Sequence, residues 1–154
     1  MKTNAMRILE SLSIPYTVHT YQWDEDHLDA VHAAESAGLD TERVYKTIVM
    51  RSSTKEVFVF CLPAEFGISL KKARALTGSR EIDLIKADEL MGLTGYIRGG
   101  CSPLGMRHRY PTFISELAQL EETIYVSGSQ RGIQIELRPD DLAKAAGASY
   151  ADFI

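Results

Sequence analysis

Two runs of β-branched and aromatic residues, close together in the chain, constrain the fold more than any other feature. Residues 43–50 read RVYKTIVM and residues 56–62 read EVFVFCL, with the polar segment RSSTK between them. Runs of this kind predict two adjacent strands. A second pair is expected in TIYVSGSQRGIQIEL, residues 123–137, where two alternating segments flank a polar turn typical of a hairpin.

Helical patterns separate these strand pairs. Apolar spacing, serine and proline starts and glycine ends predict helices in five places, at residues 6–12, 29–39, 69–78, 86–92 and 138–148. Further strands are expected at 16–21 and at 95–100, the latter running into a glycine-rich loop. Strict strand–helix alternation is lacking, so the pattern predicts an α/β (α+β) domain with a mixed sheet rather than a doubly wound fold.

Length and composition narrow the function classes. A chain of 154 residues predicts one domain, residues 1–154, long enough to bury about two-thirds of its unfolded surface. No apolar run reaches the roughly 18 residues of a membrane span, and the first residues lack a signal-peptide core, so we expect a cytoplasmic protein with no membrane partner. Two cysteines forty positions apart argue against a disulfide framework and a structural zinc site.

The charged residues are unevenly distributed along the chain. Residues 1–42 carry two basic and eight acidic residues, residues 43–109 carry twelve and six, and residues 110–154 carry three and seven. The net charge of −4 argues mildly against a nucleic-acid binder, but a basic central segment can still attract a polyanion. A solvated surface explains the same pattern equally well.

Lys46 is the first candidate for chemistry. In a strand over 43–50 it shares a face with Val44, Ile48 and Met50. A lysine among apolar residues on one strand face has two interpretations. It either prevents an edge strand from pairing with another chain, or it places a cation in a pocket. In the second case the ammonium group would orient an anionic or carbonyl group of a ligand.

The loop IRGGCSPLG, residues 97–105, is the second candidate. Gly99 and Gly100 can adopt backbone angles closed to other residues, and successive amides in such a turn can bind an anion or an oxyanion. Pro103 stiffens the loop, and a plain chain reversal is the alternative. Cys101 would need a base to act as a nucleophile, and no histidine forms a known cysteine-hydrolase signature with it.

Other polar residues give weaker signals. The four histidines, at positions 19, 27, 32 and 108, lack metal-ligand spacing, so no metal site is expected. In the hairpin, Ser127 and Gly128 lie near the turn, and Gln134 lies on the partner strand. Ordinary turn chemistry also accounts for these three residues.

Several of these segments together resemble the YbaK/EbsC family. VYKTIV with Lys46, GGCSPLG, TIYVSGSQRGIQIEL, HTYQWD near the start and DLAKAAGASYAD near the end occur in the order seen in that family. The resemblance covers essentially the whole chain. It implies the YbaK/prolyl-tRNA synthetase-associated editing fold, a single domain with a curved mixed sheet flanked by helices. It also implies a free-standing aminoacyl-tRNA deacylase that removes cysteine from proline tRNA without a metal or organic cofactor.

The resemblance assigns roles to matching residues. Lys46 matches the lysine that binds the end of the aminoacyl-tRNA, and Gly99, Gly100 and Pro103 match a Gly-x-x-x-Pro loop whose amides face the ester. Tyr21 matches a pocket-lining aromatic residue, and Ser127 matches the pocket serine beside Gly128. Gln134 stands where the family often has an acid. The implied partners are the acceptor end of mischarged tRNA and prolyl-tRNA synthetase, which the acidic first 42 residues could contact.

Three alternatives stay open at this point. The same fold could remove another amino acid, such as alanine, from proline tRNA, and Gln134 is the position at which to test that. A non-catalytic module that binds tRNA or a synthetase could keep the pocket without turnover. A cysteine-dependent hydrolase using Cys101 is the third alternative.

Overall fold

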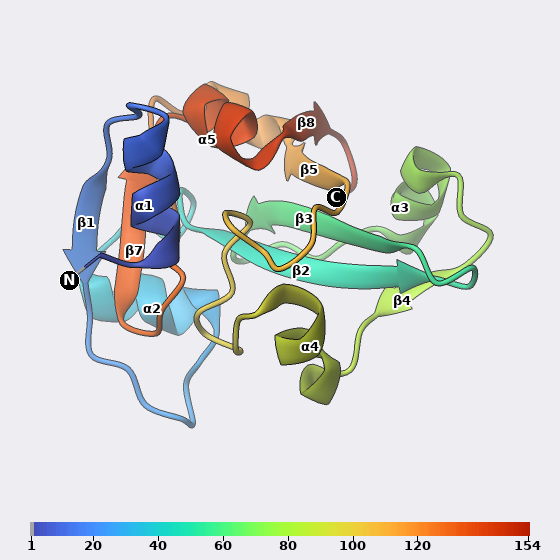
Figure 1. Ribbon diagram of the computed structural model, residues 1–154, viewed down its shortest axis with the longest axis horizontal. Coiled ribbons are helices and arrows are strands. Elements are labelled where there is room, and N and C mark those ends of the chain that lie inside the picture. The colour runs from blue at the N-terminus through green and yellow to red at the C-terminus, as the bar shows by residue number, and fades with distance from the viewer. Residues whose placement is uncertain (1) are drawn as a thin grey trace.

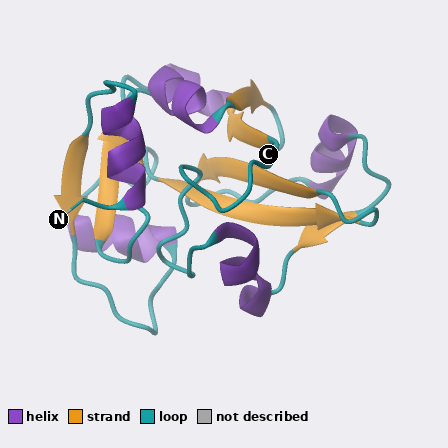
Figure 2. Ribbon diagram, in the orientation of Figure 1, coloured by secondary structure: helices purple, strands orange, loops and turns teal. Residues whose placement is uncertain are grey.

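The computed structural model describes residues 2–154 and places two β-sheets side by side with helices packed around them (Figures 1 and 2). The helices are α1 (Asn4–Ser11), α2 (Ala30–Ala37), α3 (Leu70–Thr77), α4 (Leu90–Thr94) and α5 (Pro139–Ala146), with short 3-10 helices η1 (Ala87–Glu89) and η2 (Glu116–Leu120). The strands are β1 (Thr17–Thr20), β2 (Tyr45–Ser52), β3 (Val57–Pro63), β4 (Ile82–Leu84), β5 (Thr112–Ser115), β6 (Ile124–Ser127), β7 (Ile133–Leu137) and β8 (Ala148–Ala151).

The larger sheet is mixed, as the sequence predicts. Its order is β4-β2-β3-β5-β8, with β2 antiparallel to β3 and β4, and β5 parallel to β3 and β8. The expected strand pair is confirmed, since β2 and β3 pair from Tyr45 opposite Pro63 to Arg51 opposite Val57. β3 is almost entirely buried, which explains its continuous apolar run.

The smaller sheet has the order β1-β7-β6 and is antiparallel throughout. It contains the predicted hairpin of β6 and β7. Its two faces are covered by different helices: Val126 and Ile135 pack with α1, whereas Tyr125 packs with α2. A parallel bridge between Val44 and Tyr125 joins this sheet to the start of β2. The α/β class is therefore confirmed. The strands form two sheets, and this bridge links them.

Two helices, α2 and α3, lie where expected and are capped at both ends, whereas the helix expected at 86–92 is divided into η1 and α4 and continues past Gly92 to Thr94. The Ser69 side chain accepts a hydrogen bond from the amide of Lys72 at the start of α3, and Asp29 caps α2 in the same way through His32. Gly38 and Gly78 close these two helices in the left-handed conformation. Among residues 2–154, no helix combines the length and apolar character that crossing a membrane requires.

One expected strand is wrong and three strands were not expected. Residues 95–100 form a turn rather than a strand, because Gly95 and Gly99 have φ angles of +85° and +88° and the Gly100 amide donates back to the carbonyl of Ile97. The unexpected strands are β4, β5 and β8, which are short and lie at or near the edges of the larger sheet.

Candidate functional site

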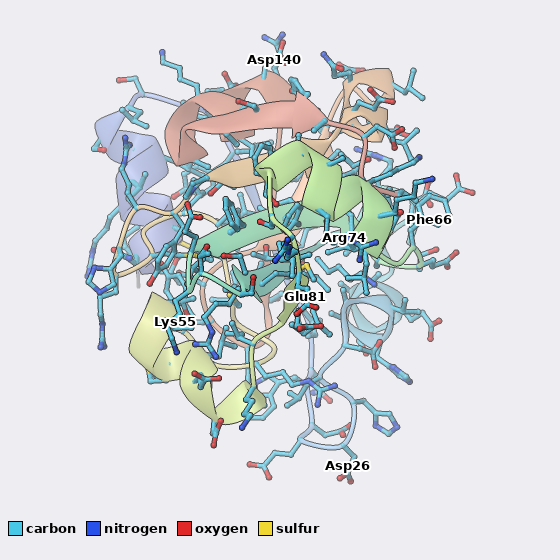
Figure 3. All side chains as sticks on the ribbon, turned by 90° about the vertical axis from the view of Figure 1, so that its right-hand side faces the viewer. Asp26, Lys55, Phe66, Arg74, Glu81 and Asp140 are labelled. Carbon is cyan, nitrogen blue, oxygen red and sulfur yellow. The ribbon has the colours of Figure 1, made fainter. Side chains whose placement is uncertain are left out.

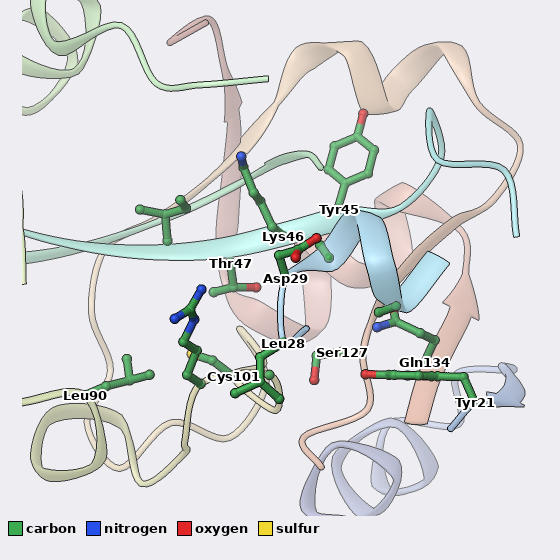
Figure 4. A pocket seen from close by; sticks show the side chains of 15 residues that line it. Tyr21, Leu28, Asp29, Tyr45, Lys46, Thr47, Leu90, Cys101, Ser127 and Gln134 are labelled. Carbon is green, nitrogen blue, oxygen red and sulfur yellow. The ribbon is translucent and has the colours of Figure 1, made fainter. Parts of the chain in front are cut away.

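A cavity of about 270 Å³ lies where the two sheets meet, beside the start of α2. It is walled by β2, by the smaller sheet and by the glycine-rich loop (Figure 4). Its lining residues are Tyr21, Leu28, Asp29, Ala30, Ala33, Tyr45, Lys46, Thr47, Ile48, Leu90, Arg98, Gly99, Cys101, Ser127 and Gln134. The cavity thus brings together five of the residues predicted from the sequence: Tyr21, Lys46, Gly99, Ser127 and Gln134.

Lys46 contributes a half-buried cation from β2. Burial lowers the pKa of its ammonium group below the ordinary value of 10.5, and the nearby Asp29 carboxylate opposes that shift. Asp29 is hydrogen-bonded to His32, accepting from its amide at 2.9 Å and contacting Nδ1 at 2.6 Å. Since these bonds already engage the carboxylate, the lysine is available to an anionic group entering the cavity.

The smaller sheet contributes three polar side chains on the side that faces α2. Ser127 on β6 is paired with Gln134 on β7, and Tyr21 follows the end of β1 (Figure 4). Gln134 is only 4% exposed, and its Oε1 has no hydrogen-bond partner among the described residues. A buried amide oxygen without a partner is unfavourable, so this atom is suited to accept a hydrogen bond from a ligand.

The glycine-rich loop is held in place from both sides. Asn4 on α1 donates hydrogen bonds to the Tyr96 hydroxyl and to the Gly105 carbonyl, and the Tyr96 hydroxyl donates to the carbonyl of Leu104. Gly100 packs directly on the backbone of residues 130 and 131. A loop fixed in this way can present its amides without reorganisation.

Only part of this loop faces the cavity. Gly99 and Cys101 line it, whereas the amide of Gly100 is engaged with the carbonyl of Ile97 at 2.9 Å. Gly99 and Cys101 are therefore the two glycine-rich-loop residues after Arg98 that line the cavity. Gly100 shapes the turn from behind.

Two other predicted residues also lie outside the cavity lining. Pro103 is buried and lines a separate cavity of about 300 Å³ together with Ile8 and Leu12 of the first helical segment. Gly128 is buried, its amide donates to the carbonyl of Ile133, and a side chain at this position would collide with Ile133. Gly128 therefore shapes the turn beside Ser127, whereas Pro103 belongs to the separate cavity.

The cysteine and histidine side chains do not assemble a nucleophilic pair in this cavity. Burial raises the pKa of the Cys101 thiol to about 12, which keeps it protonated at neutral pH. The cavity lining includes no histidine among residues 2–154, and within the same residues no group of three His, Cys, Asp or Glu side chains is placed to hold a metal ion.

Several lining residues were not predicted as site residues from the sequence, among them Leu28, Asp29 and Arg98. Asp29 carried a recognisable signal as a helix cap before AVHAAESA, but nothing in the sequence placed it beside Lys46. Arg98 directly precedes the two glycines, so a cation beside a glycine-rich loop was the signal available there.

Comparison with known proteins matches this chain along nearly its whole length. Residues 24–145 match the aminoacyl-tRNA editing domain family. A relative from Enterococcus faecalis, named "Putative Cys-tRNA(Pro)/Cys-tRNA(Cys) deacylase EbsC", is 38% identical over 151 residues, which are 98% of this chain and 92% of that protein.

Solved structures share the fold. Hypothetical protein APE2540 superposes with a TM-score of 0.88 at 20% identity, covering 98% of this chain and 99% of the other. The "putative trans-editing enzyme for prolyl tRNA synthetase" superposes with a TM-score of 0.80 at 20% identity, covering 99% and 98%. The resemblance to the YbaK/EbsC family is confirmed, and this chain belongs to the aminoacyl-tRNA editing domain family of deacylases.

Proposed function

We propose that this protein is a trans-editing enzyme that hydrolyses the ester bond of cysteine mischarged onto proline tRNA. The observation that carries the proposal is a single cavity lined by Lys46, by Gly99 of the glycine-rich loop and by Gln134, whose buried Oε1 has no hydrogen-bond partner among the described residues. The relationship to a named Cys-tRNA(Pro)/Cys-tRNA(Cys) deacylase supports the choice of cysteine and of proline tRNA.

In this proposal Lys46 binds the anionic end of the tRNA. The terminal nucleotide carries a phosphate on one side of its ribose and the aminoacyl ester on the other. An ammonium group paired with that phosphate in a partly buried cavity holds the ester at a fixed depth. The nearby Asp29 carboxylate opposes the lowering of the Lys46 pKa by burial.

The glycine-rich loop stabilises the charge that develops on the ester carbonyl. The amides of Gly99 and Cys101 are the proposed donors, because that of Gly100 is used inside the turn. One well-placed donor of this kind contributes about 3–4 kcal/mol to an acyl-transfer reaction. Backbone donors provide this stabilisation without any side-chain nucleophile.

The substrate supplies its own nucleophile. The cysteinyl sulfur attacks the carbonyl carbon of the same residue and forms a C–S bond as the ester C–O bond breaks. The thiol proton is transferred to the departing ribose oxygen, which leaves as the tRNA hydroxyl group. Water then opens the cyclic thioester to free cysteine. Holding thiol and carbonyl in a reactive geometry is the contribution of the cavity.

The smaller sheet binds the amino-acid end of the substrate. The α-ammonium group is a strong donor, and Gln134 Oε1 is a buried acceptor that lacks one. The Ser127 and Tyr21 hydroxyls lie on the same side of the cavity. Together they orient the amino group so that the thiol approaches the carbonyl carbon.

The test is hydrolysis of Cys-tRNA(Pro), Ala-tRNA(Pro) and Pro-tRNA(Pro) by the wild type, Lys46→Ala and Lys71→Ala. Lys71 is an exposed lysine of α3 and serves as the matched control. We expect rapid loss of the cysteinyl ester, and a kcat/KM lower by about tenfold to hundredfold for Lys46→Ala only.

Other outcomes are equally informative. Preferential loss of the alanyl ester would assign the enzyme to alanine instead, and Gln134→Asp would then show whether this position sets the preference. Survival of all three esters, even with prolyl-tRNA synthetase present, would refute the deacylase proposal in favour of a binding module. A ternary complex of the protein with that synthetase and tRNA is the expected arrangement.

A further inference from the structure

Trp23, the only tryptophan of the chain, lies just outside the cavity and is 45% exposed. It follows the cavity-lining Tyr21 by two residues, in the segment between β1 and α2. Its ring packs on Gly132, where a Cβ atom would lie 3.0 Å from Trp23 Cδ1 and 3.1 Å from the Tyr21 carbonyl oxygen. The absence of a side chain at Gly132, which has a φ of +86°, is what lets the indole approach the hairpin turn this closely.

Arg131 connects this indole to the glycine-rich loop. Its guanidinium carbon lies 5.1 Å from the centre of the Trp23 ring, a cation–π distance. Its Nε donates to the carbonyl oxygen of Arg98 at 2.8 Å, and its Cγ lies 3.3 Å from the position of a Cβ on Gly99. Trp23, Arg131 and Gly99 therefore form one continuous surface that leads into the cavity.

We propose that Trp23 and Arg131 form a stacking platform for an unpaired base at the 3′ end of the tRNA. This inference rests on the proposed function, because the ester enters the cavity attached to the terminal ribose. The base on that ribose, or on the nucleotide before it, then lies at the rim. An exposed aromatic ring beside a guanidinium group is the combination by which proteins bind single-stranded nucleic acid without reading its sequence.

The charges around the platform define how the strand lies. Arg98 and Arg131 are on the loop side of Trp23, whereas Asp24, Glu25 and Asp26 follow it in the chain and are exposed. Phosphate groups are attracted to the first side and repelled from the second. The backbone of the acceptor end consequently lies along the arginines, with the base directed onto the indole.

The single tryptophan makes this proposal directly measurable in the unmodified protein. Titration with the trinucleotide CCA is expected to quench the fluorescence of Trp23 with a saturable curve. A matched trinucleotide with an abasic 3′ nucleotide keeps the phosphates and tests the contribution of the terminal base. If stacking involves that base, the abasic probe binds about tenfold more weakly.

Kinetics on Cys-tRNA(Pro) provide the second readout. Trp23→Ala is expected to raise KM about tenfold with kcat changed less than about twofold, and Trp23→Phe to restore most of the loss. The matched control is Phe66→Ala. Phe66 is 46% exposed but lies between β3 and α3, well away from the segment that carries Asp26 (Figure 3). It should leave both constants unchanged.

The outcomes separate this inference from the proposed function. If Cys-tRNA(Pro) is deacylated but CCA leaves the fluorescence unchanged and Trp23→Ala keeps the wild-type KM, the platform is refuted while the deacylase stands. If CCA quenches the fluorescence but no ester is hydrolysed, the platform stands and the deacylase proposal fails. Because the fluorescence experiment uses the wild type, a misfolded variant does not affect it.

Discussion

Lys46 sits at the boundary between water and the protein interior, and its titration should report its role. Burial lowers the pKa of its ammonium group, so the group loses its proton at a lower pH than an ordinary lysine. An anion is attracted only while the group is protonated. We therefore predict that CCA binding weakens as pH rises through this lowered pKa, before the usual value of 10.5 is reached.

The measurement is the Kd of CCA from pH 7 to 10. Lys46→Arg serves as the reference, because arginine keeps its proton throughout that range. Its affinity should stay flat where that of the wild type falls. Parallel pH profiles for the two proteins would show that another group is responsible for the pH dependence.

Cys101 is predicted to be dispensable. Its thiol lines the cavity, but burial raises its pKa to about 12, and the buried Cys61 thiol has its pKa raised to about 12 as well. At pH 7.5 both thiols should therefore resist iodoacetamide in the folded protein and react after denaturation, as mass spectrometry can show. Cys101→Ala should keep kcat within about threefold, since the proposed chemistry uses only the backbone amide there. Rapid inactivation by iodoacetamide that Cys101→Ser abolishes would support a cysteine hydrolase instead.

How much of the site could be read from the sequence depended on the kind of signal each residue gave. Lys46 stood out because a lysine interrupts an apolar strand face, and Gly99 because paired glycines mark an unusual turn. Gln134 was singled out through the resemblance, because the family often has an acid there, but only the structure shows that its oxygen is buried without a partner among the described residues. Asp29 gave a capping signal, but its proximity to Lys46 depends on how α2 packs against the sheets.

At the scale of elements, two glycines in or near the glycine-rich loop should respond in opposite ways to alanine. Gly92 lies in α4 with no atom within 4 Å of a Cβ position, so Gly92→Ala should stabilise the protein by about 0.5–1 kcal/mol. Gly105 has a φ of +75°, and its Cβ would lie 2.6 Å from Ile8 Cδ1. Gly105→Ala should therefore destabilise the protein by about 2–4 kcal/mol.

Urea denaturation of both variants tests this pair. The denaturation midpoint should rise for Gly92→Ala and fall for Gly105→Ala, without a change in the slope for either. A fall for both would mean that α4 does not tolerate a side chain on its exposed side. No loss for Gly105→Ala would mean that the contact between this loop and α1 is loose.

The elements with local signals were predicted and those without them were not. Capping residues such as Ser69 and Gly78 mark the ends of α3 in the sequence itself. By contrast, β8 is ASYA, a short segment without a run of β-branched or aromatic residues, and it pairs in parallel with β5. The wrong strand at 95–100 was suggested by Tyr96 and Ile97, whereas Gly95 and Gly99 adopt left-handed angles that break any extended run.

At the scale of the whole molecule, a chain of net charge −4 should bind tRNA through few ionic contacts. Three cations lie at or beside the cavity, namely Lys46, Arg98 and Arg131. Three contacts to a single strand predict that log KM rises with log salt concentration with a slope of about 2. The slope is measured from the KM for deacylation at KCl concentrations from about 50 to about 300 mM.

Lys46→Ala should reduce this slope by about 0.7, the share of one phosphate contact. A much steeper slope in the wild type would mean that the basic residues of the central segment contact the tRNA well beyond its acceptor end. An unchanged slope in the variant would remove Lys46 from the phosphate contact while leaving the other two cations in place.

The bridge between Val44 and Tyr125 has a consequence for how such enzymes diverge. It places the cation of Lys46 on one sheet and Ser127 and Gln134, the proposed amino-acid contacts, on the other. Substitutions on β6 and β7 can therefore change which misacylated tRNA is hydrolysed, while the proposed contact between Lys46 and the tRNA phosphate is unchanged. A lineage of proofreading enzymes can in this way acquire new amino-acid preferences in a few mutational steps, without having to reinvent how it holds tRNA.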